Sequence, residues 1–336
     1  MKLHSVLLNI FLFVVTCGNL SAQTSTVIPG QQPAPTAVKR PPSISDSPHQ
    51  IAAAEQGKKD PPIDRNAPPE WARERIEAKN GHYKTFTSKT IGQAVSYFIY
   101  IPAAYEHSKE ARFPVLYWLH GMGGGQGGIP ILSQRFDAAI DIGKTPPLLI
   151  VFVNGMRNSF YCDSADGKTP VETVIVKDLI PHIDTTYRTI ARREGRIVEG
   201  FSMGGFGAAH LGFKYPELFG TVSIIDGSLT DVTAMQTKQA DLYRRIFGDD
   251  EKRFAAEDPR QLVPKNQDAI RGKTKIRLAV GLLKPVNLSF HQQLTDLKID
   301  HDYDVFDVGH NPLAIFDSLG DKNWSFYRQA VSHRPE

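Results

Sequence analysis

The sequence is poor in cysteine: only Cys17 and Cys162 occur among its 336 residues. Cys17 lies in a predicted N-terminal targeting segment, so the chain left after removal of that segment would keep one cysteine and could form no intrachain disulfide. A single cysteine in the apolar stretch Phe160-Tyr161-Cys162 is typical of a partly buried, inert side chain rather than of a nucleophile. We therefore expect the hydrophobic core alone to stabilise the fold.

The sequence also lacks a block of charge of one sign. Thirty-nine Lys and Arg residues against 36 Asp and Glu residues give a formal net charge of +3, and these charges are spread along the chain. This balance gives no indication of a nucleic acid or an anionic membrane surface as a partner. The apolar run from Val6 to Val15 is too short for a comfortable membrane span, so we expect no span once the targeting segment is removed.

Residues 1–22 have the pattern of a secretion signal. A basic start and the apolar run are followed by Leu20-Ser21-Ala22, which suit a cleavage site. We predict cleavage before Gln23 and a secreted or periplasmic protein. Lipidation at Cys17 is the less favoured alternative, because Thr16 is larger than the residue expected before a lipidated cysteine.

The next stretch, residues 23–69, is rich in proline, serine and charged residues and has almost no periodic apolar pattern. Such a composition cannot bury enough apolar surface to offset the entropy of ordering, so we predict a disordered leader. A globular domain is predicted over residues 70–336. We expect it to open with a short amphipathic helix over 70–78, directly after two prolines.

The globular part begins with alternating apolar patterns and continues with short, wholly apolar runs separated by helical stretches. Strands are predicted over 83–88, 95–102, 115–119, 148–153, 196–201, 221–225, 276–280 and 302–306, and helices over 172–187, 205–214 and the C-terminus. Apolar strands alternating with helices predict an α/β fold, with a mostly parallel sheet and helices on both faces. The charged stretch 229–267 is predicted to form a small helical cap over the site.

The pentapeptide Gly200-Phe201-Ser202-Met203-Gly204 fits the pattern Gly-x-Ser-x-Gly between a predicted strand and a predicted helix. A sharp strand-to-helix turn would present the Ser202 hydroxyl at a helix N-terminus, where backbone N–H groups favour developing negative charge. Glycines flank such a serine because larger neighbours would collide. The sequence therefore predicts a nucleophile elbow with Ser202 as the nucleophile, in preference to a merely structural turn.

A second motif, the glycine-rich stretch 120–125, directly follows the predicted strand 115–119. Loops in this position supply the other donor of an oxyanion hole, so we predict that the backbone N–H groups of Met122 and Met203 form the hole. A phosphate-binding loop is disfavoured because no Gly-Lys-Ser/Thr follows. His120 is expected to be a buried, hydrogen-bonding residue that shapes the loop.

His310, just past the last predicted strand, is the candidate general base, because in this kind of enzyme the histidine comes late in the chain and after that strand. The other histidines considered, His182, His210, His291 and His301, lie in helical stretches or at their ends, where surface or packing roles are expected.

Several further motifs carry a family resemblance: Tyr97-x-Ile-Tyr-Ile-Pro, Phe113-Pro-Val-Leu-Tyr-Trp-Leu-His-Gly, Asp178-Leu-Ile-Pro-His-Ile-Asp, Gly200-Phe-Ser-Met-Gly-Gly and Lys214-Tyr-Pro-Glu-Leu-Phe. With them the chain, from about Tyr83 to Tyr327, resembles the putative-esterase family of α/β hydrolases. That family includes feruloyl and acetyl-xylan esterases, S-formylglutathione hydrolase, enterochelin esterase and mycolyltransferases. The resemblance implies an eight-stranded α/β-hydrolase sheet, a Ser/His/acid triad and no cofactor or metal.

The sequence departs from this family at the triad acid, which members usually carry after the seventh strand. Lys284 stands there, and a shift to Asn287 would give only a neutral partner. Asp226, directly after the sixth strand, is the preferred replacement, because the histidine loop can be reached from either neighbouring strand end. Asp226 could instead cap a turn. Asp304 and Asp307 are weaker candidates because they belong to the same local segment as the histidine.

Together these features predict a secreted serine esterase in which Ser202 attacks the ester, His310 transfers the proton and Asp226 orients the histidine. Feruloyl or acetyl esters of plant sugars are the expected substrates, while S-formylglutathione is disfavoured by the export signal. Two alternatives stay open. The chain could be a ligand-binding protein on an esterase scaffold, or an acyltransferase that uses the same residues and excludes water.

Overall fold

The computed structural model describes residues 70–332. The predicted signal segment 1–22 and leader 23–69 lie outside the described residues. Among residues 70–332, no helix is both long enough and apolar enough to cross a membrane.

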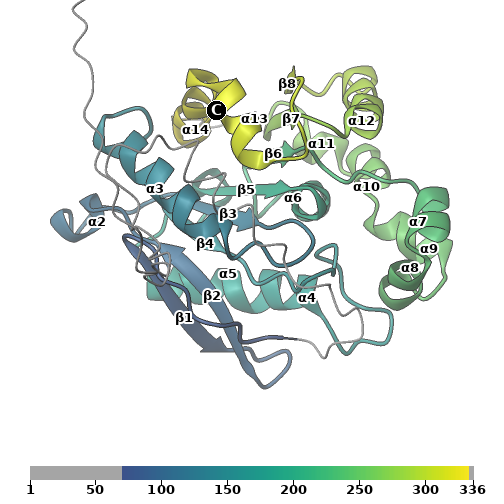
Figure 1. Ribbon diagram of the computed structural model, residues 1–336, viewed down its shortest axis with the longest axis horizontal. Helices are drawn as coiled ribbons and strands as arrows, with labels where there is room; N and C mark the ends of the chain where they lie inside the picture. Colours follow the sequence, from purple (N-terminus) through teal and green to yellow (C-terminus); the bar gives the residue numbers. More distant parts are fainter. Residues whose placement is uncertain (1–69, 333–336) are drawn as a thin grey trace, which may run out of the picture. The chain divides into compact units, whose positions relative to one another are not determined.

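One sheet of eight strands forms the centre of the molecule (Figure 1). The strands are β1 (Gly81–Thr87), β2 (Ala94–Tyr100), β3 (Val115–Leu119), β4 (Leu149–Phe152), β5 (Arg196–Phe201), β6 (Thr221–Ile225), β7 (Lys275–Val280) and β8 (Asp302–Val305). They lie in the order β1-β2-β4-β3-β5-β6-β7-β8. The pairings that involve β2 are antiparallel and all the others are parallel. This arrangement confirms the predicted α/β-hydrolase sheet.

Alternate residues of the central strands point to opposite faces of the sheet and enter two separate cores. On β3, Val115, Tyr117 and Leu119 belong to one core, whereas Leu116 and Trp118 belong to the other. All five are buried, as expected for a strand that is covered on both faces.

Helices cover both faces of the sheet, and Figure 1 shows α3, α13 and α14 together on one side. The helices on that side are α3 (Gly128–Asp141), α13 (Pro312–Leu319) and α14 (Asp321–Ser332), and they carry the second core. Most of the others contribute to the first core. Those from the first half of the chain are α2 (Ala104–His107), α4 (Val171–Thr173), the π-helical turn Val174–Leu179, α5 (Ile180–Thr186), the 3-10 turn Arg193–Gly195 and α6 (Met203–Lys214). Those after β6 are α7 (Val232–Lys238), α8 (Ala240–Phe247), α9 (Glu251–Glu257), α10 (Pro259–Lys265), α11 (Gln267–Ile270) and α12 (Lys284–Asp296).

The predicted helix over 70–78 is wrong, because this segment has no regular secondary structure and bends at residues 71–72. Its backbone groups have partners outside the segment. The Trp71 carbonyl accepts from the Ser96 N–H at 2.7 Å and from the Asn154 amide at 3.0 Å. The Arg73 N–H donates to the Ser96 hydroxyl at 3.0 Å. The amphipathic spacing predicted a helix, but the backbone groups of the segment are instead satisfied by hydrogen bonds with a neighbouring strand and loop.

The predicted cap is helical, since α7 to α11 occupy that part of the chain. Its hydrogen bonds, however, include ones to the loop that follows β4 and to α6. Arg245 donates to the Asn158 carbonyl at 2.8 Å, and Arg253 donates to the Asp163 and Ser164 carbonyls. Within residues 70–332, no hydrogen bond joins α7 to α11 to the predicted catalytic residues. The helices therefore extend the first core beside α6 rather than forming a bonded lid over the site.

Candidate active site

Three strand ends bring the predicted catalytic residues together. Ser202 follows β5, Asp226 follows β6 and His310 follows β8. These strands are parallel, so their carboxyl ends lie along one edge of the sheet, which is where open α/β sheets place their sites.

Ser202 occupies a strained turn between β5 and α6, with φ 60° and ψ −117°. This left-handed conformation is costly for a residue with a side chain, and such strain persists where the surroundings enforce it. The Ser202 N–H donates to the Ile225 carbonyl at 3.0 Å. A Cβ atom on Gly204 would lie 2.0 Å from the Leu119 carbonyl oxygen, and one on Gly200 would lie 2.0 Å from the Gly204 oxygen. The turn thus requires both glycines of the motif.

A chain of two hydrogen bonds joins the three side chains. His310 Nε2 lies 2.8 Å from Ser202 Oγ, and His310 Nδ1 lies 2.6 Å from Asp226 Oδ2. Since a carboxylate only accepts hydrogen bonds, Nδ1 carries the proton and Nε2 is free to accept the serine proton. The ring of Phe201 packs against the imidazole with centroids 4.4 Å apart. The arrangement can serve a nucleophile and its general base.

The Asp226 carboxylate is fully buried and is held chiefly by backbone N–H groups. Gly281 and Leu283 donate to Oδ1 at 3.1 and 2.9 Å, and Leu282 donates to Oδ2 at 3.1 Å. Burial acts to raise the pKa of Asp226, but the hydrogen bonds from His310, Leu283 and Gly281 outweigh it and lower the pKa below its usual value. The carboxylate is therefore ionised and ready to orient the imidazole.

The other residues considered for the acid have different partners. Lys284 lies 3.3 Å from Asp307 on the surface, and Asp304 pairs with Lys322 at 2.6 Å. The buried Asn287 donates to the carbonyls of Gly227 and Leu283. Within residues 70–332, none of the four is hydrogen-bonded to His310.

The predicted oxyanion donors flank the serine. Met203 is the first residue of α6, whose N-terminal dipole favours negative charge. A Cβ atom on Gly121 would lie 3.3 Å from the Ser202 Cβ, so the peptide unit that carries the Met122 N–H lies beside the nucleophile. Among residues 70–332, neither the Met122 N–H nor the Met203 N–H donates a hydrogen bond. Both are therefore available to an oxyanion.

His120 is buried, as expected, and bonds to its own loop. Its Nδ1 lies 2.7 Å from the Gly121 carbonyl oxygen, and its backbone carbonyl accepts from the Tyr161 hydroxyl at 3.0 Å. Burial, aided by the charge of Arg73, lowers the pKa of His120 to about 3. The ring is therefore neutral and donates through Nδ1.

Sequence patterns missed Ser228, which lies beside the nucleophile. Its hydroxyl is 3.5 Å from Ser202 Oγ, and its N–H donates to the Ser202 carbonyl at 2.9 Å. The only indication in the sequence is that Ser228 follows Asp226 by two residues at the end of the same predicted strand.

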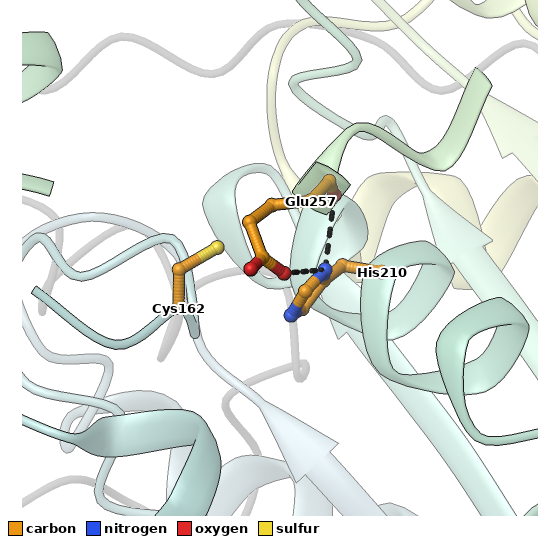
Figure 2. Close-up of side chains that lie close together, drawn as sticks. All are labelled: Cys162, His210 and Glu257. Carbon is orange, nitrogen blue, oxygen red and sulfur yellow. Dashed lines mark hydrogen bonds and ion pairs between the residues drawn. The ribbon is translucent and has the colours of Figure 1, made fainter. Parts of the chain in front are cut away.

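A second polar cluster is the one group within residues 70–332 whose composition suits a metal ion. The donor atoms of Cys162, His210 and Glu257 lie within 4.8 Å of one another (Figure 2). However, His210 Nδ1 is 2.9 Å from the Glu257 carbonyl and Nε2 is 2.7 Å from the Glu172 carboxylate. With an acceptor at each nitrogen, the ring is doubly protonated and has no lone pair for a metal.

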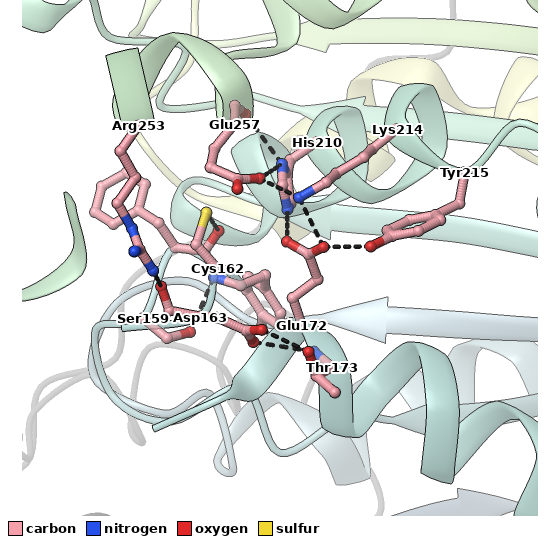
Figure 3. A network of polar contacts seen from close by, with 12 residues as sticks. Ser159, Cys162, Asp163, Glu172, Thr173, His210, Lys214, Tyr215, Arg253 and Glu257 are labelled. Atoms are coloured by element: carbon pink, nitrogen blue, oxygen red, sulfur yellow. Dashed lines mark hydrogen bonds and ion pairs between the residues drawn. The ribbon is translucent and has the colours of Figure 1, made fainter. Parts of the chain in front are cut away.

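This buried network extends well beyond those three residues (Figure 3). Lys214 lies 2.7 Å from Glu172 and 2.5 Å from Glu257, and the Tyr215 hydroxyl donates to Glu172. Burial acts to lower the pKa of His210, but its neighbours Cys162 and Glu172 raise it well above its usual value. Burial raises the pKa of the Cys162 thiol, which is therefore uncharged. The negative charge that keeps His210 protonated is that of the Glu172 carboxylate. The network ties α6 to α4 and to α9.

The fold and site define an α/β hydrolase with a candidate serine nucleophile. Residues 88–333 match the family described as Putative esterase, and the chain belongs to that family of carboxylic ester hydrolases.

Similar curated proteins match parts of the chain. An endo-1,4-beta-xylanase/feruloyl esterase of Xylanibacter ruminicola is 31% identical over 163 residues, which are 46% of this chain and 22% of that protein. An esterase of Mycobacterium tuberculosis is 32% identical over 43% of this chain and 32% of its own length. An acetyl esterase of Caldicellulosiruptor saccharolyticus is 27% identical over 65% of this chain and 80% of its own length. The match thus spans less than a third of the first two relatives.

Solved structures of similar fold include a ferulic acid esterase, with a TM-score of 0.63 and 23% identity over 74% of this chain and 98% of that one. An S-formylglutathione hydrolase from Agrobacterium tumefaciens gives a TM-score of 0.59 and 17% identity over 75% of this chain and 95% of that one. At these identities the likeness shows the fold.

Proposed function

We propose that the protein hydrolyses carboxylic esters through a covalent acyl-enzyme on Ser202. The observation that carries the proposal is the chain of hydrogen bonds from Ser202 Oγ to His310 and from His310 to Asp226, at 2.8 and 2.6 Å. A nucleophile bonded to a base, and a base bonded to a buried carboxylate, is the arrangement that activates a serine.

In the proposed reaction, Ser202 Oγ attacks the ester carbonyl carbon while His310 Nε2 takes the hydroxyl proton. The N–H groups of Met122 and Met203 bind the oxyanion. His310 then gives its proton to the leaving alcohol as the carbon–oxygen bond breaks. Water then attacks the carbonyl carbon of the acyl-enzyme while His310 takes a proton from it. The carbon–oxygen bond to Ser202 breaks, the acid is released and His310 returns the proton to Ser202 Oγ.

We further propose sugar-linked feruloyl or acetyl esters as the substrates of a secreted or periplasmic enzyme, with residues 70–336 as the catalytic domain. The names of the similar proteins, a xylanase/feruloyl esterase, an acetyl esterase and a ferulic acid esterase, support this class. The exposure of the site supports it too. The His310 side chain is 31% exposed, and Met122 and Leu282 are 41% and 60% exposed. Such an open rim suits an ester that projects from a larger carbohydrate.

The test compares the purified mature protein with its Ser202→Ala and His310→Ala variants on p-nitrophenyl acetate, methyl ferulate and acetylated xylan. Each variant should lose activity by roughly a millionfold, as seen when the serine or histidine of a triad is removed. Wild type, but not Ser202→Ala, should be labelled by a fluorophosphonate probe. A wild type that neither hydrolyses esters nor takes the label would instead indicate a binding protein.

A further inference from the structure

The glycine-rich loop at the site is bound by a segment that lies before the family match, which begins at residue 88. This segment, residues 70–76, makes two hydrogen bonds, one with the loop and one with the residue that directly follows the loop. Arg73 Nη1 donates to the Gly124 carbonyl at 2.6 Å, and Gln126 donates to the Glu74 carbonyl at 2.9 Å. The segment is irregular where a helix was predicted, and in this conformation these groups reach the loop.

Arg73 is buried without a carboxylate partner. It is 9% exposed, and within residues 70–332 no Asp or Glu lies within ion-pair distance of it. Its Nε and Nη2 atoms have no hydrogen-bond partner among those residues, so the bond to Gly124 is the one that its side chain makes there. A buried, unpaired charge is unfavourable for folding. Its position is therefore better explained by what it does to the loop than by a gain in stability.

The loop at this point favours glycine, because its backbone adopts a conformation that residues with side chains rarely take and a Cβ atom would meet the guanidinium closely. Gly124 has φ 121°, and a Cβ atom there would lie 3.0 Å from Arg73 Nη1. The guanidinium therefore packs directly on the loop backbone. The planar fork of an arginine suits such a contact better than the single ammonium of a lysine.

Met122 lies between two anchored points of the loop. On one side, His120 holds the Gly121 carbonyl at 2.7 Å, and on the other side Arg73 holds the Gly124 carbonyl at 2.6 Å. The Gly121 carbonyl and the Met122 N–H belong to the same planar peptide unit, so fixing the first aims the second. The Gly123 N–H, which donates to the Arg157 carbonyl at 2.8 Å, adds a third anchor.

We propose that Arg73 is a positioning residue for catalysis, which clamps the glycine-rich loop so that the Met122 N–H points at the oxyanion. The inference rests on the proposed esterase function. Arg73 does not touch the reacting atoms, so its removal should weaken binding of the transition state and leave binding of the ester itself nearly unchanged.

The test is Arg73→Met, with Arg75→Met as a matched control. Arg75 lies in the same segment, but its side chain is 73% exposed and pairs only with Glu77. Arg73→Met should lose about a hundredfold in kcat, the scale of one lost oxyanion donor. Its KM should stay within about threefold of wild type, because the lost interaction forms only in the transition state. Arg75→Met should match wild type in both.

A boronic acid that forms a tetrahedral adduct with the serine supplies a second readout. Its inhibition constant should rise in parallel with the loss in kcat, because the adduct fills the oxyanion site as the transition state does. Arg73→Lys, which keeps the charge but not the fork, should recover only part of the activity.

Gln126→Ala tests the clamp if Arg73→Met does not fold, as judged by circular dichroism. It removes the partly exposed bond to Glu74, leaves the buried arginine in place and should lower kcat by about fivefold, equivalent to one ordinary hydrogen bond. The inference is overturned if a folded Arg73→Met variant keeps kcat within about threefold of wild type. A raised KM with unchanged kcat would overturn it equally. A wild type inactive on every ester would instead refute the proposed function.

Discussion

Helix α6 has a histidine-centred cluster at its start and another along its length. In each cluster one ring nitrogen faces a carboxylate, and the two clusters differ in the group that faces the other nitrogen. His310 lies between the Asp226 carboxylate and the Ser202 hydroxyl. His210 lies between the Glu172 carboxylate and the Glu257 carbonyl. A hydroxyl can donate a proton to the ring and a carbonyl cannot. Similar residue types therefore permit proton exchange with a hydroxyl in one place and hold a fixed cation in the other.

The two carboxylates also differ in how they are held. Backbone N–H groups of residues 281–283 hold Asp226, whereas the side chains of His210, Lys214 and Tyr215 hold Glu172. The first cluster reaches solvent through His310, whereas the second is closed around His210, which has no exposed side-chain surface. The first arrangement is the one that the proposed reaction needs, and the second joins helices.

Asp226→Asn should have the largest effect among the tests that separate the clusters. An amide in place of the carboxylate favours the wrong imidazole tautomer, so kcat should fall by about ten-thousandfold with little change in fold. Steady-state hydrolysis of p-nitrophenyl acetate measures the loss. Asp307→Asn, which alters only a surface pair with Lys284, is the control and should keep full activity. Full activity in Asp226→Asn would place the triad acid elsewhere.

His210→Leu should affect stability instead of chemistry. It leaves the buried Glu172 and the half-buried Glu257 beside a single cation, and breaking a buried ion pair in this way costs about 3 kcal/mol. Urea unfolding measures the change. His291→Leu, in the half-buried stacked pair with Tyr303, should cost less than about 1 kcal/mol. A His210→Leu variant that is as stable as wild type but inactive would contradict the assignment of the His210 cluster to stability rather than to chemistry.

The pH dependence of stability should also separate the clusters. The pKa of His210 is raised above its usual 6.5. Its contribution to the free energy of unfolding is therefore complete below pH 6.5 and is lost as the pH rises through the pKa of the folded state. The pKa of Glu172 lies below its usual 4.5, because His210 and Lys214 outweigh the effect of burial, so its contribution is lost only as the pH falls through that lower value. The difference in unfolding free energy between wild type and His210→Leu should therefore be largest between pH 4.5 and 6.5. A difference that grows above pH 6.5 would contradict a buried imidazolium.

Lys284→Ala should have the smallest effect. Lys284 is the residue at the position where relatives were expected to carry their acid, but its side chain pairs, among residues 70–332, with one exposed aspartate alone. Because backbone groups hold Asp226, kcat should change by less than about twofold, as for other exposed ion pairs. Lys214→Met, a matched lysine substitution in the closed cluster, should lower the melting temperature. Equal melting temperatures for the two variants would contradict the contrast between backbone and side-chain support.

The sheet could be predicted because its central strands are short and mostly apolar. β3, β5 and β6 begin and end at the predicted residues, and the fold itself is confirmed. Ser202, His310 and Asp226 could be chosen because each directly follows a strand, and parallel strands end at one edge of a sheet. Their catalytic roles remain predictions.

Other features leave no local pattern. His210 meets its partners across 38 and 47 residues, so no spacing in the sequence announces the network. Arg73 sits in a segment that reads as helical, yet its backbone bonds to a strand and its side chain to a glycine 51 residues away. Contacts of this kind depend on how the elements pack, and propensity does not encode them.

Leu282 shows what backbone support allows. Its N–H holds the Asp226 carboxylate, while its side chain is 60% exposed at the rim of the site. Every amino acid except proline supplies the same N–H. The codon for this residue could therefore be randomised to change which esters are accepted, without disturbing the acid that orients the histidine.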